Sequence, residues 1–88
     1  MMDPTLQARF EAAAQDALAL PSRPDNETML KLYALFKQGK SGDASGSRPG
    51  MFDMVGRAKY DAWAALKGTP RESAMQSYID LVESLRGG

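Results

Sequence analysis

Residues 39–52, GKSGDASGSRPGMF, constrain the fold of this 88-residue chain more than any other feature of its sequence. They contain four glycines and one proline, so a regular helix cannot run through them. Such a long connection is unusual in a compact domain, where most loops have about 4–6 residues. It is long enough to return the chain to the same end of a bundle, so the helices before and after it can run parallel. The alternative is a mobile loop without a role.

The chain before this loop predicts two helices. The first begins at Asp3 and Pro4, because aspartate caps free amides and proline is tolerated at the first helical position. Prolines within residues 21–24 end it, and the second helix begins near Asp25 and runs to about Gln38. Apolar residues of the first helix recur at helical spacing and form one face toward a core: Leu6, Phe10, Ala13, Ala17 and Leu20.

The chain after the loop predicts two more helices. The third begins at Asp53, a capping residue, and runs to Lys67. The fourth begins at Thr69, the cap, with Pro70 at the first helical position. Its apolar face contains Met75, Tyr78, Ile79, Val82 and Leu85. No strand pattern is visible, so the sequence predicts an all-α fold with four helices in one domain, residues 1–88.

Composition excludes several classes of function. The chain has neither cysteine nor histidine, which excludes disulfides, zinc–thiolate sites and nucleophiles activated by histidine. A mechanism based on carboxylates stays open, but no isolated acidic pair stands out. We expect a protein that is not an enzyme and needs no cofactor or metal. Eleven basic residues balance eleven acidic ones, which argues against nucleic-acid binding. No apolar run approaches the roughly 20 residues of a membrane span, and the N-terminus lacks a signal-peptide pattern, so we expect a cytoplasmic protein without stable membrane insertion.

The second helix carries more apolar residues than a peripheral helix needs. From Met29 to Phe36, only Lys31 and the hydroxyl of Tyr33 are polar. Tyr33, Phe36 and Lys37 share a face, because they are spaced at i, i+3 and i+4. An aromatic ring offers a flat surface to a purine, and a lysine offers a point charge to phosphate. The alternatives are that the rings belong to the core, or that the apolar face docks a partner helix.

The third and fourth helices offer a second set of candidate ligand-binding residues. Arg57 and Lys59 make the start of the third helix basic, so a phosphate could dock there, although Lys59 is also consistent with an ordinary exposed lysine. Trp63 is large and lies on the apolar line, which favours a core position. Tyr78 lies in the middle of its apolar face, and its hydroxyl points either into a groove or to solvent.

Several blocks of the sequence, in order, resemble the acyl-CoA-binding protein family. They span about residues 10–85, and collinear blocks of this kind are far more specific than one short motif. The matching positions are Pro24 and residues 29–30, 32–38, 42–43, 48–51, 56–63, 66–69, 74–75 and 78–79.

This resemblance implies a four-helix bundle with up-down-down-up topology, in agreement with parallel helices around the long loop. It implies a protein that binds medium- to long-chain fatty acyl-CoA without chemistry and serves its intracellular transport or pool. We also expect a monomer, because this needs no further assumption. Tyr33, Lys37 and Lys59 would hold the phosphorylated ribose, and Phe36 and Tyr78 the adenine and groove region. The full set of expected ligand-binding residues is Leu18, Met29, Leu30, Tyr33, Leu35, Phe36, Lys37, Val55, Lys59 and Tyr78.

The sequence departs from the family pattern at several positions. Phe36 and Tyr60 replace a frequent tyrosine and a frequent tryptophan, and Gly39 replaces a small residue that has a side chain. Leu18 and Val55 stand where many members carry lysine, which removes two contacts to phosphate. We expect these departures to change affinity rather than the mode of binding.

Overall fold

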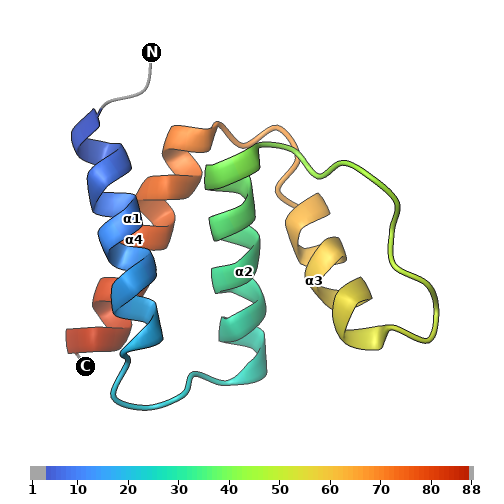
Figure 1. Cartoon of the computed structure of the whole chain (residues 1–88), viewed down its shortest axis with the longest axis horizontal. Coiled ribbons are helices and arrows are strands. Elements are labelled where there is room, and N and C mark those ends of the chain that lie inside the picture. Colours follow the sequence, from blue (N-terminus) through green and yellow to red (C-terminus); the bar gives the residue numbers. More distant parts are fainter. Residues whose placement is uncertain (1–3, 88) are drawn as a thin grey trace.

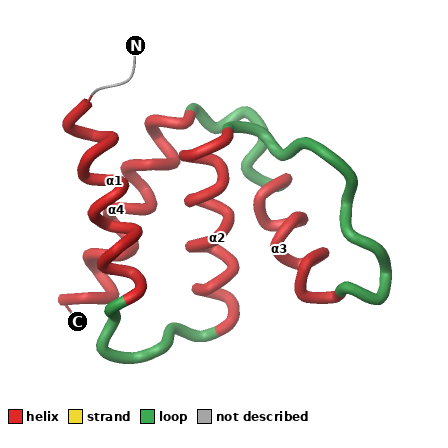
Figure 2. Tube along the Cα trace, viewed as in Figure 1, coloured by secondary structure: helices red, strands yellow, loops and turns green. Residues whose placement is uncertain are grey.

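Four helices make up the part of the chain that the computed structural model describes, residues 4–87. They are α1 (Pro4–Leu18), α2 (Asn26–Ser41), α3 (Met54–Ala64) and α4 (Arg71–Gly87). Figure 1 shows that α1 and α4 run in one direction, whereas α2 and α3 run in the other. The long loop between α2 and α3 carries the chain back along the molecule, so that these two helices are parallel (Figure 2). The predicted all-α, up-down-down-up bundle is confirmed.

The predicted cap at Asp53 is present, and Asp25, near which the second helix was expected to begin, is also a cap. Oδ1 of Asp25 accepts the backbone N–H of Thr28 at 2.8 Å, and Oδ1 of Asp53 accepts that of Gly56 at 2.9 Å. Each bond satisfies an amide that the first turn of the helix leaves without a partner. The predicted cap at Asp3 lies outside the described residues.

The structure corrects the start of the fourth helix. The first backbone bond of α4 runs from the N–H of Ala74 to the carbonyl of Pro70 at 3.1 Å, so Pro70 precedes the helix instead of opening it. The carbonyl of Thr69 accepts a side-chain hydrogen bond from Gln38 at 2.9 Å. Proline suits this position, since it has no N–H that would need a partner.

The end of α2 differs from the prediction, because the helix continues past Gln38 through Gly39 to Ser41. Gly39 is buried and lies where α2 touches two other helices. A Cβ at this position would lie 3.0 Å from Cγ of Met75 and 3.1 Å from Cζ of Phe10. A glycine inside a helix costs about 1 kcal/mol relative to alanine, but here it permits close packing. The helix ends at Gly42, which has a φ of 79°.

The end of α3 also differs from the predicted end at Lys67. The regular helix stops at Ala64, and the chain continues in a tighter turn. The N–H of Leu66 donates to the carbonyl of Trp63 at 3.0 Å, and that of Lys67 to Ala64 at 3.1 Å. These i to i+3 bonds are typical of the last turn of a helix. Gly68, with a φ of 90°, then reverses the chain toward α4.

The core lies between α1, α2 and α4, whereas α3 packs on α2 beside it (Figure 1). Most of the predicted apolar faces supply it, which explains their helical spacing. From α3, the buried residue is Trp63, whose Nε1 donates to the carbonyl of Gly42 at 2.8 Å. The buried cluster is Phe10, Ala13, Leu32, Leu35, Met75, Tyr78, Ile79 and Val82.

A polar cluster near the end of α2 binds the chain both before and after α3. The sequence analysis did not predict this cluster. Gln38 is completely buried, and its Nε2 donates to Oδ1 of Asp43 and to the carbonyl of Thr69, each at 2.9 Å. Oδ1 of Asp43 also accepts the N–H of Gly68 at 2.9 Å. These bonds fix the position of α3 beside α2.

The long loop is also bound to α3 along its course. Nε and Nη2 of Arg48 donate to the two carboxylate oxygens of Asp61 at 2.8 and 2.7 Å. The hydroxyl of Tyr60 donates to the carbonyl of Gly46 at 3.2 Å. A bidentate guanidinium–carboxylate pair fixes orientation as well as distance.

Among the described helices, none is long and apolar enough to cross a membrane.

Candidate ligand-binding groove

A groove of about 1070 Å³ lies along the face of α2 that the core does not cover. The end of α1 and the connection to α2 line one side of it, the start of α3 lines the other, and Tyr78 of α4 also contributes. The molecule that carries this groove is flat, with Cα extents of 37 × 35 × 15 Å. Its volume reaches the upper end of the range for small-molecule sites, about 300–1,000 Å³.

The residues of α2 that line the groove lie on one side of the helix because of their spacing. Asn26, Met29, Tyr33 and Phe36 follow one another at intervals of three or four residues and all line the groove. Leu30, four residues after Asn26, also lines the groove. Apart from Asn26 at its start, this side of α2 is apolar, with the tyrosine hydroxyl near its middle.

All but two of the predicted ligand-binding residues lie along this groove. Leu35 points into the core, since two helical residues correspond to a rotation of about 200° away from Tyr33. Lys37 lies on the side of α2 that faces α3. The predicted residues that line the groove are Leu18, Met29, Leu30, Tyr33, Phe36, Val55, Lys59 and Tyr78.

Three lysines near the groove each lie over an aromatic ring. Nζ of Lys59 is 5.4 Å from the ring centroid of Tyr33, and Nζ of Lys37 is 4.7 Å from that of Trp63. The third is Lys40, whose Nζ lies 5.7 Å from the ring of Phe36. Sequence reasoning missed Lys40, although its position four residues after Phe36 was a usable signal.

None of these three lysines forms an ion pair with a carboxylate in residues 4–87, where the ion pairs join Arg48 to Asp61 and Arg86 to Asp16. The faces of aromatic rings attract cations only weakly at exposed sites. The ammonium groups therefore remain available to an anionic ligand, which a carboxylate partner would have prevented.

The inner side of the groove rests on a cluster of three rings. Phe10 stacks on Phe36 with centroids 5.4 Å apart, and Tyr78 packs edge-on against Phe10 at 5.3 Å. Tyr78 is only 5% exposed and lines the groove, in agreement with the first of the two orientations that the sequence left open. Burial raises the pKa of Tyr78. A tyrosine hydroxyl is protonated at neutral pH and can donate a hydrogen bond.

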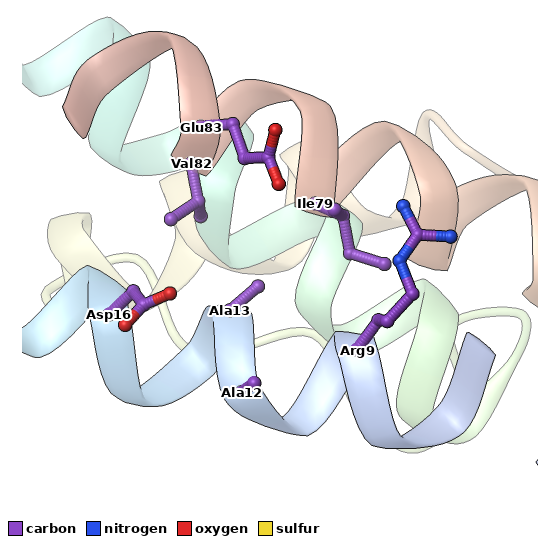
Figure 3. A pocket seen from close by; sticks show the side chains of 7 residues that line it. All are labelled: Arg9, Ala12, Ala13, Asp16, Ile79, Val82 and Glu83. Atoms are coloured by element: carbon purple, nitrogen blue, oxygen red, sulfur yellow. The ribbon is translucent and has the colours of Figure 1, made fainter. Parts of the chain in front are cut away.

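A second, smaller hollow of about 130 Å³ lies between α1 and α4 (Figure 3). Arg9, Asp16 and Glu83 surround an apolar base formed by Ala13, Ile79 and Val82. Two of its charges are already engaged, because Arg9 donates to Gln76 at 3.5 Å and Asp16 pairs with Arg86 at 3.2 Å. It is too small for an organic ligand of ordinary size.

The chemistry of the large groove suits a long apolar molecule with an anionic end. Aliphatic and aromatic side chains form most of its lining, and lysines lie at its edges. In residues 4–87, no three histidine, cysteine, aspartate or glutamate side chains gather into a set that could hold a metal ion. Fold and groove thus define a small helical protein with a site for an amphipathic anion.

Comparison with known proteins agrees with this class. Residues 7–82 match the sequence model of the family described as Acyl CoA binding protein. Acyl-CoA-binding protein homolog 1 of Caenorhabditis elegans is 47% identical over 76 residues, which cover 86% of this chain and 88% of that protein. The crystal structure of Oryza sativa Acyl-CoA-Binding Protein 2 superposes with a TM-score of 0.86 at 44% identity, covering 91% of this chain and 89% of the other. The chain belongs to the acyl-CoA-binding protein family.

Longer proteins also contain a similar region. Enoyl-CoA delta isomerase 2 of Homo sapiens is 47% identical over 79 residues, which cover 90% of this chain but only 20% of the isomerase. The chain therefore spans about a fifth of the length of that relative.

Proposed function

We propose that this chain binds medium- to long-chain fatty acyl-CoA esters and serves their intracellular transport or maintains their pool, without converting them. One observation carries the proposal: a single apolar groove has lysines at its edges that no carboxylate neutralises. An acyl-CoA ester combines a hydrocarbon chain with a phosphorylated nucleotide, and the groove offers a surface to each. Membership of the family supports the same ligand.

The proposed roles follow from position. Tyr33, Lys37 and Lys59 bind the phosphorylated ribose, and Phe36 and Tyr78 contact the adenine. The acyl chain lies along the aliphatic part of the groove. The residues proposed to contact or support this chain are Leu18, Met29, Leu30 and Val55, with Leu35 packing behind them in the core.

The energetics favour long chains. Each buried methylene contributes about 0.8 kcal/mol, so about 14 methylenes contribute on the order of 10 kcal/mol before ordering costs. Contacts between lysine and phosphate add roughly 1.5–3 kcal/mol each. Together they are sufficient for nanomolar affinity. The nucleotide end supplies selectivity, and the chain supplies most of the affinity.

The proposal includes several finer points. The chain acts as one acyl-CoA-binding domain over residues 1–88, in the cytoplasm, as a monomer that needs no cofactor. It binds no nucleic acid and does not insert stably into membranes. It has no catalytic role, and the activity named for its isomerase relative is not assigned to it, because this chain matches only a fifth of that protein.

Titration calorimetry with saturated acyl-CoA esters of increasing length tests the proposal. We expect affinity to rise with chain length, and free CoA and free fatty acid to bind weakly. Long-chain esters should also raise the melting temperature, since they bind only the folded state. Equal affinity for short and long esters would contradict a role of the groove in binding the chain. Failure of every ester to bind would favour a protein-interaction role for the apolar face of α2.

A further inference from the structure

We propose that Lys40 is a third phosphate-binding lysine of the groove and helps to select ligands with a phosphorylated nucleotide end. This inference rests on the proposed function, because it assigns a further residue to the same site. Lys40 was not among the residues that the sequence analysis singled out. It is exposed, and it lies in the last turn of α2.

The helical register places Lys40 at the end of the groove. The lining residues Asn26, Met29, Tyr33 and Phe36 follow intervals of three, four and three residues, and the next interval of four leads to Lys40. Its Nζ lies 5.7 Å from the ring of Phe36, which lines the groove. Lys40 therefore continues the row of side chains that would contact the ligand.

The neighbouring charges leave Lys40 available. It forms no ion pair with a carboxylate in the described part of the chain, and its contact is with a ring. Lys37 lies three residues before it, so the two residues are neighbours on the surface of α2, although Nζ of Lys37 lies over Trp63 and Nζ of Lys40 over Phe36. A phosphate between them can attract both flexible side chains.

Hydrogen bonds hold the backbone around Lys40 in place, whereas the stem of a lysine side chain is flexible. Nε of Arg71 donates to the carbonyl of Gly39 at 3.1 Å, and Nη2 donates to the carbonyl of Lys40 itself at 3.0 Å. These bonds hold the end of α2 against the start of α4. The flexible stem of lysine can then move its charge from the ring of Phe36 to a phosphate without movement of the backbone.

The test compares Lys40→Gln with Lys31→Gln, a matched control. Both variants remove one exposed lysine charge from α2, and neither lysine belongs to the groove lining itself. Nζ of Lys40 lies over Phe36, which lines the groove, whereas Lys31 lies over no ring in residues 4–87. We expect Lys40→Gln to weaken binding of one long-chain acyl-CoA roughly 3- to 10-fold at low salt, between the effects of an exposed ion pair and a charge-assisted hydrogen bond. Lys31→Gln should leave affinity within about twofold, as for an unpaired surface charge.

Further measurements separate phosphate binding from a structural effect. Lys40→Arg should retain most of the affinity, and Lys40→Gln should reduce the salt dependence of binding. The factor lost in Lys40→Gln should be the same for every acyl chain length, because the chain does not reach this end of the site. A loss that varies with chain length, or equal affinities of Lys40→Gln and Lys31→Gln, would overturn the proposal.

Coenzyme A offers two kinds of phosphate, a monoester on the ribose and a diphosphate bridge. The same titrations with an acyl-dephospho-CoA, which lacks the monoester, identify the partner. If the difference between wild type and Lys40→Gln disappears, Lys40 binds the monoester, and if it persists, Lys40 binds the diphosphate. Failure of the wild-type chain to bind any acyl-CoA would overturn the proposed function itself, whereas normal wild-type binding with an unaffected Lys40→Gln would overturn only this inference.

Discussion

Nε2 of Gln38 donates a 2.9 Å hydrogen bond to Oδ1 of Asp43, and this bond joins the end of α2 to the loop that leads to α3. The same carboxylate oxygen accepts the N–H of Gly68, at the far end of α3. Val55 and Lys59 belong to α3 and line the groove. The Gln38–Asp43 pair therefore holds one wall of the groove in place, although neither residue lines it.

Asp43→Asn should lower the free energy of unfolding at neutral pH. This free energy should also fall less in the variant than in the wild type as the pH is lowered. Hydrogen bonds from the Gly68 N–H and then from the Gln38 side chain lower the pKa of Asp43 below its usual 3.8. A lowered pKa in the folded state gives stability that is present above the unfolded pKa and is lost as pH falls through the folded pKa. Urea unfolding from about pH 7 to about pH 2 measures this.

The matched control for this carboxylate is Glu83→Gln, an exposed position on α4 without such hydrogen bonds. It should change the unfolding free energy less than Asp43→Asn at neutral pH. The prediction is wrong if wild type and Asp43→Asn give parallel curves over the whole pH range.

Gly39→Ala should destabilise the fold by about 1–3 kcal/mol, in spite of the better helix propensity of alanine. The added Cβ would lie 3.0 Å from Met75 and 3.1 Å from Phe10, and both neighbours are buried in the core. Chemical unfolding provides the measurement. Gly87→Ala is the control, since no atom outside its own helix turn lies within 4 Å of a Cβ there, and it should be neutral or slightly stabilising. A Gly39→Ala variant as stable as Gly87→Ala would show that the core can adapt.

Lys37→Ala and Tyr33→Phe should weaken acyl-CoA binding without unfolding the protein. Loss of a lysine–phosphate contact should reduce affinity on the order of 10-fold or more, and loss of the tyrosine hydroxyl roughly 2- to 10-fold. Calorimetry measures affinity, and a thermal melt without ligand confirms that each variant is folded. Lys31→Ala serves as the control on the same helix. If both variants bind as the wild type does while remaining folded, the proposed site for the phosphorylated ribose is incorrect.

Val55→Lys should strengthen binding of acyl-CoA roughly 2- to 5-fold at low salt, because it adds a cation at the edge of the groove. Val55 is 67% exposed, so the substitution removes little buried surface. The gain should shrink as salt is added, since exposed charges are screened. Val55→Gln adds a polar side chain without charge and should show no gain. Equal weakening by both substitutions would instead place the acyl chain against this residue.

Much of the fold could be predicted from the sequence, because local signals defined it. Asp25 and Asp53 begin helices as expected, and the apolar spacing of α1 and α4 identified residues that the structure buries. The end of α2 could not be predicted, since a glycine usually weakens a helix and Gly39 is retained by packing against Phe10 and Met75 on other helices. No local pattern reveals such a contact.

The sequence predicted most of the residues that line the candidate groove, but not how their side chains pair with one another. The sequence placed aromatic and basic side chains on the second and third helices, and all but Leu35 and Lys37 of the expected residues line the groove. It did not predict which ring each lysine would lie over, or the position of Lys40 over Phe36. Whether these residues bind acyl-CoA remains the prediction that the titrations address.

By itself, the sequence determined the number of helices, the residues that begin the second and third of them and the types of side chain on each face, because capping and periodicity act over a few neighbouring residues. The tertiary structure alone decided which side of α2 became core and which became groove. Leu35 and Tyr33 are both apolar enough for either position. They differ because α4 and Phe10 of α1 pack against one side of α2, whereas Tyr33 lies on the part of α2 that lines the groove. Burial depends on the placement of distant helices, which no local pattern specifies.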